Sequence, residues 1–451
     1  MPPKVALIGC LIIIGTIIYL FDKKEKREVS WALFLPLIWM CVIGSRNISQ
    51  FLDPGGGDTQ DVYFDGSPID RWFYTIIIII GIIVLLRRKI SLVEIIRQNI
   101  WIFAFFAYCG FSLSWSDYPY VSIKRFIKNI GNIVMVLIVI SDSNPKYAFR
   151  LLFKWFSYIL LPLSVVLYKY FSHIGRGYHR YTGELLITGV TNNKNALGTV
   201  CFISSMFFIW NLFLKKEDHD FDGKYEYYGS CIILLLSLYL LHKSNCSTAD
   251  VCLVFGSLVL LLLRKKNEFI SKIKASVYIS GFLIVIFLTT AYQLNIHSLV
   301  DVTGHSDTFW GRVTLWSEFV DLSSGSIYFG EGYDSYWLGE RLKILWDRYW
   351  WHPTEAHNGY VEIFLELGVV GLIMFFAVFR SCLNKLIYNM EKGEENSIIR
   401  FAFFITIMLY NIPESAVKGL HVMWFLFLLV TMEYRFTHSD IDYTERHGYV
   451  V

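Results

Sequence analysis

Long apolar stretches separated by short polar connections dominate the chain from its first residues to about position 434. An apolar run of about 17 to 20 residues is long enough to cross a hydrocarbon core of about 30 Å as a helix. A helix is the expected form, because a backbone surrounded by lipid must satisfy its own hydrogen bonds. The pattern predicts membrane spans near residues 5–21, 30–45, 72–86, 100–114, 128–141, 153–171, 196–214, 229–242, 249–263, 275–293, 362–379, 398–411 and 420–434.

These ranges predict an all-α polytopic membrane protein, a bundle of about 12 to 13 transmembrane helices. The stretches 100–114 and 229–242 are shorter than the usual spanning length, so the count is open by one. The first span is followed by no small-residue cleavage site before Lys23, so we expect it to be retained.

One long polar stretch, residues 294–361, interrupts the apolar pattern between the spans at 275–293 and 362–379. No repeat of fixed period and no low-complexity linker divides the chain. We therefore expect a single multi-pass membrane domain, 1–451, that contains 294–361 as an extracytoplasmic loop subdomain.

Basic residues predict the orientation of the chain in the membrane. They cluster on alternate connections, among them Lys23–Arg27, Arg87–Lys89 and Arg264–Lys266. The positive-inside rule places such connections in the cytoplasm, which puts the N-terminus outside and the C-terminus inside. By the same parity, the connections that face the outside are 46–71, 172–195, 243–248 and 294–361.

The composition supports this class and excludes others. The 451 residues are 55% hydrophobic and only 18% charged, which departs from an ordinary soluble domain. A formal net charge of +3 gives no reason to expect nucleic acid as a partner. The eight cysteines are scattered without a CxxC pair, so neither a disulfide framework nor a cysteine metal site is expected.

The end of the long polar stretch carries the residue best suited to proton transfer. His357 and Asn358 directly precede the apolar segment that starts near Ile363, so the imidazole is expected where water meets lipid. A neutral imidazole accepts a proton near pH 7, and an interfacial histidine bonded to a backbone carbonyl is the alternative. Glu355, Glu362 and Glu366 are close enough in sequence to orient or tune the ring.

Cations in two outer stretches suggest an anionic ligand. Arg176 and Arg180 precede an asparagine-rich run that ends at Asn195, where the span from 196 begins. Free N–H groups at a helix start favour an anion, and arginine grips phosphate in a fork. Lys194 would add charge, and the alternative is a capped helix start with snorkelling cations. In the long polar stretch, Arg312 stands close to an aromatic residue.

A further basic segment, Tyr120–Lys128, has cations on one helical face and apolar residues on the other. Such a segment is expected to lie along the membrane surface. Lys124 and Arg125 would anchor it to lipid headgroups or, alternatively, contact a substrate phosphate.

Several motifs occur together in an order that resembles a known family. They are Trp115–Ser116 with Ser122–Arg125, Gly189–Thr191 followed by Lys194–Gly198, Gly311–Arg312 through Trp316, Gly330 with Gly332–Tyr333, and His357–Tyr360 followed by Glu366–Gly368. Each motif alone is degenerate, and their order, spacing and shared outer face carry the resemblance. From about Ser67 to Val430, the chain resembles the O-antigen ligase and Wzy-type polysaccharide polymerase superfamily, and within it the exopolysaccharide polymerase branch.

The resemblance implies a glycosyltransferase at the outer face of a bacterial inner membrane. Its donor would be a polyprenyl-pyrophosphate-linked oligosaccharide, and its acceptor would be the hydroxyl of a glycan or glycolipid. Neither a metal nor another cofactor is expected. Membrane lipids and other polysaccharide-assembly proteins are the remaining expected partners.

The resemblance also implies roles for single residues. Arg180 and Arg312 would hold the pyrophosphate, with Arg176 as the alternative to Arg180. His357 would support attack by the acceptor hydroxyl. The expected substrate-binding residues are Arg176, Lys194, Asn195, Lys124, Arg125 and Asn358. This sequence departs from the family at His305 and Trp310, which bears on donor recognition and not on the reaction class.

The competing hypothesis is a lipid-linked oligosaccharide flippase or transporter. Transport predicts ionisable residues near the middle of spans and discontinuous helices. The predicted spans are nearly free of charge, and the polar groups gather in the outer connections. An enzyme is therefore the preferred interpretation.

Overall fold

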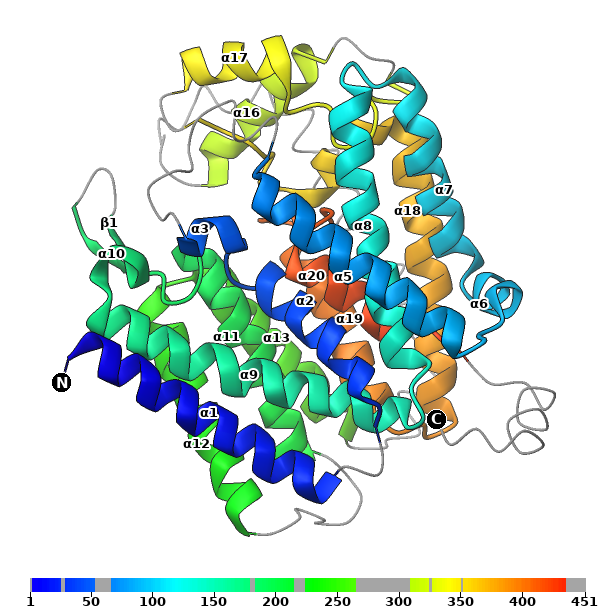
Figure 1. Cartoon of the computed structure of the whole chain (residues 1–451). Helices are drawn as coiled ribbons and strands as arrows, with labels where there is room; N and C mark the ends of the chain where they lie inside the picture. The colour runs from blue at the N-terminus through cyan, green and yellow to red at the C-terminus, as the bar shows by residue number, and fades with distance from the viewer. Residues whose placement is uncertain are drawn as a thin grey trace.

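The computed structural model describes residues 2–25, 29–52, 66–178, 183–214, 224–264, 309–323, 327–349 and 352–434. These residues are mostly helical with very little strand, which confirms the predicted all-α class (Figure 1). The described strands β1 (Arg176–Tyr178) and β2 (Leu185–Ile187) form one small antiparallel hairpin, with Gly177 opposite Leu186.

The described helices occur in both halves of the chain. In the first half of the chain they are α1 (Pro3–Glu25), η1 (Trp31–Leu33), α2 (Phe34–Ile43), α3 (Ile48–Leu52), α5 (Pro68–Arg87), α6 (Leu92–Gln98), α7 (Ile100–Ser112), η2 (Leu113–Trp115), α8 (Pro119–Ile140), α9 (Pro145–Tyr170), α10 (Ser172–Gly175), α11 (Lys194–Ile209) and η3 (Trp210–Leu214). In the second half they are α12 (Lys224–Ser244), α13 (Ser247–Arg264), α16 (Phe309–Asp321), α17 (Gly339–Arg348), α18 (Gly359–Glu391), α19 (Ser397–Tyr410) and α20 (Val422–Thr431).

Side-chain caps fix where several of these helices begin. The Ser67 hydroxyl accepts a hydrogen bond from the Ile69 amide at the start of α5, and Pro68 occupies the first helical position. Asn144 caps α9 and Asn193 caps α11 in the same way. The cap at Asn193 sets the start of the helix that carries the asparagine-rich motif.

Four described helical segments are long and apolar enough to cross a membrane, namely α5, α9, α18 and Lys194–Phe213, which joins α11 to the start of η3. The number rises to five if α6 and α7, which meet at an angle of 98°, form one broken span. Every predicted span that falls on described residues is helical, and the span at 275–293 lies outside them. The chain is therefore a multi-pass membrane protein. The count of 12 to 13 crossings stays a prediction, because helices such as α19 and α20 are short.

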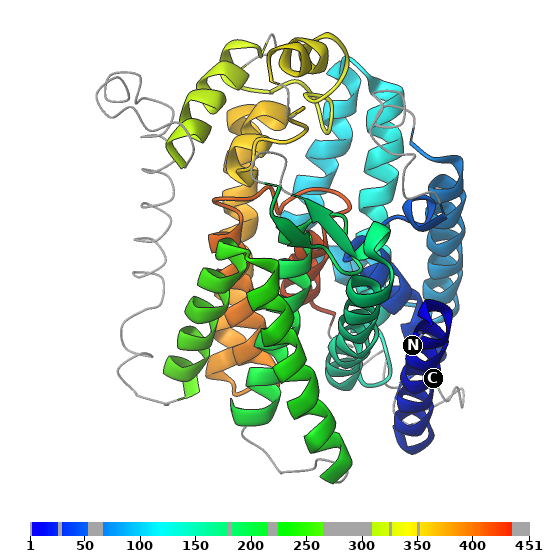
Figure 2. The same ribbon diagram turned by 90° about the vertical axis from the view of Figure 1, so that its left-hand side faces the viewer.

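The described helices lie side by side in a bundle (Figure 2), and most of their buried apolar side chains form one continuous core. α11 packs against α12 and α13, α18 packs against α7, and α19 packs against α13 and α20. Large side chains fill the centre, including Trp39, Phe153 and Phe207, each fully buried. This rigid bundle fixes the connections at its ends, where the polar motifs lie.

A second, smaller apolar cluster lies beneath α16 and α17 at one end of the bundle (Figure 1). Trp316 from α16 and Trp337 pack with Val361 and Leu365 from the first turns of α18. The polar stretch thus rests on the helix that follows it. The extracytoplasmic subdomain 294–361 stays a prediction, because 294–308 lies outside the described residues.

The predicted surface segment Tyr120–Lys128 requires a correction. These residues form the first half of α8, which continues without a break to Ile140. The segment is therefore not a separate helix along the membrane surface. Its polar face packs on protein instead: Arg125 forms an ion pair of 2.6 Å with Asp334, and both side chains are largely buried.

Candidate active site

His357 lies in the connection that leads into α18, one residue before its cap. The next residue, Asn358, is fully buried, and its Oδ1 accepts hydrogen bonds from the amides of Tyr360 and Val361 at 2.9 and 3.1 Å. Asn358 therefore serves as the N-cap of α18. His357 itself has a φ of 50°, in the left-handed region that residues with a Cβ rarely adopt. Such a conformation persists where the surrounding contacts impose it.

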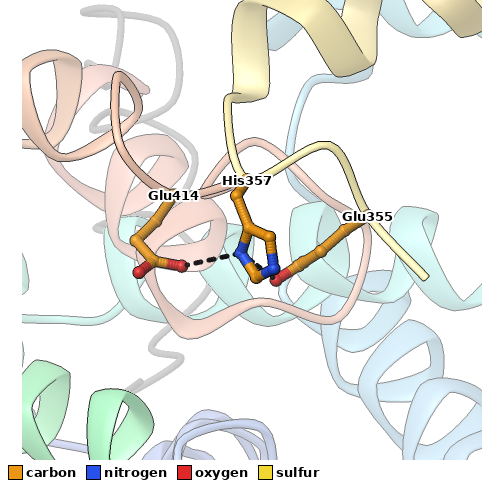
Figure 3. A group of neighbouring side chains, drawn as sticks. All are labelled: Glu355, His357 and Glu414. Carbon is orange, nitrogen blue, oxygen red and sulfur yellow. Dashed lines mark ion pairs between the residues drawn. The ribbon is translucent and has the colours of Figure 1, made fainter. Parts of the chain in front are cut away.

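Two carboxylates face one nitrogen of the His357 ring (Figure 3). Nδ1 lies 3.2 Å from Glu355 Oε1 and 3.5 Å from Glu414 Oε2. The side chains of His357 and Glu355 are about one-third exposed, at 31% and 30%, whereas that of Glu414 is 11% exposed. The ring is therefore open to solvent on one side and anchored by carboxylates on the other.

Glu414 comes from the connection between α19 and α20, residues 411–421, which is packed into the molecule. The Asn411 carbonyl accepts a hydrogen bond from the Gly359 amide at 2.9 Å. The Asn411 Oδ1 accepts from the amides of Ala416 and Val417 at 3.0 and 3.1 Å. At the far end of the connection, Asn132 of α8 donates to the Gly419 carbonyl. The connection 411–421 is thereby fixed to the start of α18 and to the middle of α8.

Asn195 joins the asparagine-rich motif to the histidine. Its Nδ2 donates to Glu414 Oε1 at 3.1 Å, while Glu414 Oε2 faces His357. One turn further along α11, the Thr199 hydroxyl bonds the Tyr410 hydroxyl at 2.8 Å. The structure thus brings Asn195 and His357 together through a residue that belongs to neither motif.

The backbone beside His357 is held by Glu362. Its Oε2 accepts from the Ala356 amide at 2.8 Å, and its Oε1 accepts from the indole N–H of Trp337 at 2.6 Å. Trp316 donates to the Ala356 carbonyl at 2.7 Å, so both backbone polar groups of Ala356 are satisfied. Of the three glutamates predicted to orient the ring, Glu355 contacts it, Glu362 fixes the segment that carries it, and Glu366 lies buried one turn further along α18.

Lys418 and His421 complete the polar surroundings. Lys418 Nζ lies 3.2 Å from the Thr354 carbonyl and 3.5 Å from Glu362 Oε1. Burial lowers the pKa of His421, an effect opposed by the charges of Glu355 and Glu414 and reinforced by Lys418. The Nδ1 of His421 accepts a hydrogen bond from the Met423 amide at 3.2 Å, so the ring caps α20 in its neutral form.

Other predicted binding residues make contacts within the protein. Arg176 Nε donates to the Tyr168 carbonyl at 2.9 Å, and its guanidinium lies 5.1 Å from the centre of the Tyr168 ring. Lys194 reaches the Asn245 carbonyl at 3.3 Å, and Lys124 lies over the Tyr120 ring. These contacts and the Arg125 ion pair hold the four side chains within the protein, and their substrate-binding roles stay a prediction.

Two central predictions fall beyond what the structure describes. Arg180 and His305 lie outside the described residues, and of Arg312 and Trp310 only the backbone, on α16, is described. The predicted gathering of Arg180, Arg312 and His357 around one diphosphate therefore stays a prediction.

Sequence reasoning missed two features of this region. Arg46 is buried and donates to the Thr191 carbonyl at 2.9 and 2.6 Å and to the Ile174 carbonyl at 2.6 Å, which ties the hairpin and the asparagine-rich loop to α2 and α3. The other is the connection 411–421. Its signal was present: by parity it joins the last two spans on the outer face, and it carries Glu414, Lys418 and His421.

Glu355, His357 and Glu414 also form a candidate cation site. One possible ligand atom from each residue lies within 4.8 Å of the others. Two carboxylates and an imidazole are ligands that zinc and other divalent transition metals accept. The sequence-based expectation of a metal-free site stays a prediction.

Comparison with known proteins supports the motif-based resemblance. The family model described as O-antigen ligase matches residues 229–376, a range that includes α16, α17 and His357. The chain resembles the O-antigen ligases. It is also 24% identical over 290 residues to the exopolysaccharide production protein ExoQ of Rhizobium meliloti (strain 1021), a match that covers 62% of this chain and 63% of that relative. The predicted resemblance to the ligase and polymerase superfamily is thereby confirmed. The match covers somewhat less than two thirds of the length of ExoQ.

Proposed function

We propose that the protein is a membrane glycosyltransferase that moves or polymerises glycan from a polyprenyl-pyrophosphate-linked donor onto an acceptor hydroxyl. The observation that carries the proposal is His357, partly exposed and held by two carboxylates at the start of a long apolar helix. A basic group at the edge of the bundle suits a reaction between a lipid-anchored donor and a water-borne hydroxyl. The O-antigen ligase match, which includes His357, supports the same class.

The proposed reaction breaks the bond between the anomeric carbon and the pyrophosphate oxygen. The acceptor oxygen forms the new bond to that carbon, and its proton passes to His357. The electron pair of the broken bond leaves on the lipid pyrophosphate, which Arg180 and Arg312 would neutralise. Pyrophosphate is already a good leaving group, so alignment and charge neutralisation supply most of the catalysis. On this proposal no metal or other cofactor takes part.

We further propose that the reaction takes place at the outer face of the bacterial inner membrane, with the N-terminus outside and the C-terminus in the cytoplasm. Contacts among the predicted outer connections support this. Arg46 binds Thr191 and Lys194 binds Asn245, so three of these segments, 46–71, 172–195 and 243–248, meet at one polar region. Membrane lipids and the acceptor glycan or glycolipid would be its partners, in a possible complex with other polysaccharide-assembly proteins.

The test is elongation of labelled lipid-linked repeat units by the purified protein in proteoliposomes. We expect longer glycans with the wild type and none with His357→Ala, at equal amounts of membrane protein. His173→Ala is the matched control, because His173 is exposed on the short helix α10. A flippase would move the labelled lipid between leaflets without lengthening the glycan, and this result would refute the enzyme proposal.

A further inference from the structure

Glu355 and Glu414 both place a carboxylate near the same nitrogen of the His357 ring. An N–H at Nδ1 can donate fully to only one acceptor, and Glu355 and Glu414 both stand within 3.5 Å of that nitrogen as ion-pair partners. The two carboxylates differ in how firmly they are held. Glu414 is 11% exposed and its other oxygen is bonded to Asn195, whereas Glu355 is 30% exposed. Glu414 is therefore the acceptor with the better-defined position.

We propose that Glu414 is a positioning residue that orients the His357 ring, and that Asn195 in turn orients Glu414. This inference rests on the proposed function, in which His357 receives the proton of the acceptor hydroxyl. A carboxylate at Nδ1 keeps the proton on that nitrogen and leaves the lone pair of Nε2 free to act as the base. When Nε2 takes the hydroxyl proton, the ring becomes cationic, and the same carboxylate stabilises that charge.

The contacts that hold Glu414 suit such a role. The connection 411–421, which carries Glu414, is bonded to the amide that follows the cap of α18, through the Gly359–Asn411 hydrogen bond. Since His357 lies two residues before Gly359, ring and carboxylate are attached to the same rigid point. Asn195 fixes the carboxylate from a third element, the first turn of α11. A geometry held from three elements restricts the ring to one orientation, which is what a proton transfer at Nε2 requires.

The competing explanation is a divalent cation between the same three side chains. Ligand atoms separated by 3.2 and 3.5 Å are compatible with neighbouring positions around a small metal ion as well as with ion pairs between the side chains. Lys418 favours the metal-free arrangement, because its ammonium is bonded to the carbonyl of Thr354, the neighbour of Glu355, and already brings a positive charge there. Metal dependence is therefore treated as an outcome of the test.

The test compares Glu414→Gln, Glu355→Gln, His357→Gln and the double variant Glu414→Gln/His357→Gln in the proteoliposome assay. Glu414→Gln is expected to lower kcat by about 10²- to 10⁴-fold, the range known for general bases and for residues that orient them, with KM for the lipid-linked donor nearly unchanged. Glu355→Gln is expected to cost less than tenfold. The double variant should be no slower than His357→Gln, because Glu414 acts only through the ring.

Four results would overturn the proposal. They are a kcat of Glu414→Gln within threefold of the wild type, a larger loss in Glu355→Gln than in Glu414→Gln, a further large loss in the double variant, and activity that a chelator abolishes and Zn²⁺ or Mn²⁺ restores. Glu414→Asp provides the folding control and should recover part of the rate.

A spectroscopic measurement separates this proposal from the proposed function. In protein labelled with ¹⁵N-histidine, the wild-type His357 signals should show the proton on Nδ1 at neutral pH, and Glu414→Gln should move a fraction of it to Nε2. His357→Gln assigns the signals. An unchanged proton distribution refutes the role of Glu414 whether or not the protein elongates glycans. A changed distribution in a protein without elongation activity refutes only the proposed function.

Discussion

Asn195 and Glu414 are 219 positions apart, and a hydrogen bond of 3.1 Å joins the side-chain amide of one to the carboxylate of the other. Glu414 also faces His357 (Figure 3), so the bond to Asn195 connects the first turn of α11 to the entrance of α18. The connection between α19 and α20 is thus the structural link between the two motifs that sequence reasoning identified. Its polar residues are placed by bonds to three helices, in addition to the bonds of Asn411 within the connection itself.

Asn195→Ala should lower the elongation rate about tenfold while the amount of folded protein stays the same. The substitution removes one hydrogen bond to a charged group, which is worth roughly 1.5 kcal/mol, and frees the Glu414 carboxylate to rotate. The rate is measured with labelled lipid-linked repeat units. Asn192→Ala is the matched control, since Asn192 lies in the same run but bonds Gln50 at an exposed position. Equal losses in both variants would show that the run acts as a whole and that the Asn195 bond has no special part.

Gly359→Ala should destabilise the protein and reduce its activity together. A Cβ at this position would overlap the side-chain oxygen of Asn411, which anchors the connection that carries Glu414. Overpacking of this kind costs roughly 1 to 3 kcal/mol. Thermal unfolding in detergent measures the effect. Gly15→Ala is the control, because a Cβ on Gly15 in α1 meets nothing within 4 Å. A Gly359→Ala protein with wild-type melting and activity would show that the connection adapts freely.

His421 should make the protein less stable as the pH falls. Burial lowers the pKa of His421 in the folded protein, whereas the unfolded chain titrates near 6.5. Below about pH 6.5 the unfolded state therefore binds a proton that the folded state does not, so the free energy of unfolding decreases as the pH falls toward the folded pKa. Above about pH 6.5, His421 is neutral in both states, so its protonation no longer reduces the free energy of unfolding.

The substitution His421→Asn tests this contribution. Asparagine keeps an acceptor for the Met423 amide at the start of α20 but does not titrate. The difference in melting temperature between pH 7.5 and pH 5.5 should be smaller in the variant than in the wild type. His173→Asn, at an exposed position, should leave that difference unchanged. An identical acid dependence in wild type and His421→Asn would rule out this histidine as the source.

The fold class could be predicted because it follows from local physics. Apolar length predicts helices in lipid, and each predicted span on described residues is helical. Asn358 and Asn193, at helix starts, were also within reach of sequence reasoning, since asparagine is a preferred cap. The true length of α8 could not be predicted from the sequence. The cations at its start resemble a surface segment, and only the structure shows that Arg125 pairs with Asp334.

The candidate site could be predicted only in part for a related reason. His357 and its neighbour Glu355 are close in sequence, so their contact was foreseeable. Glu414 reaches the ring only through the packing of α19 and α20 against the rest of the bundle, which no local pattern encodes. Arg46 was missed because its partners are backbone carbonyls, and any sequence can supply those.

The structure describes one of the two arginines between which the sequence could not choose, Arg176, and the choice stays a prediction. Arg176 is committed to the Tyr168 carbonyl and to the face of the Tyr168 ring, so its guanidinium supports the end of α9. We therefore predict that Arg176→Ala lowers the melting temperature but leaves KM for the lipid-linked donor within about twofold. Arg180→Ala should instead raise that KM or abolish elongation, because a bidentate contact to phosphate is worth several times an ordinary hydrogen bond. Arg180→Lys keeps the charge without the fork and should recover only part of the activity. If Arg176→Ala proves to be the variant that loses donor affinity at unchanged stability, the pyrophosphate contact belongs to Arg176, and the Tyr168 interaction must open when substrate binds.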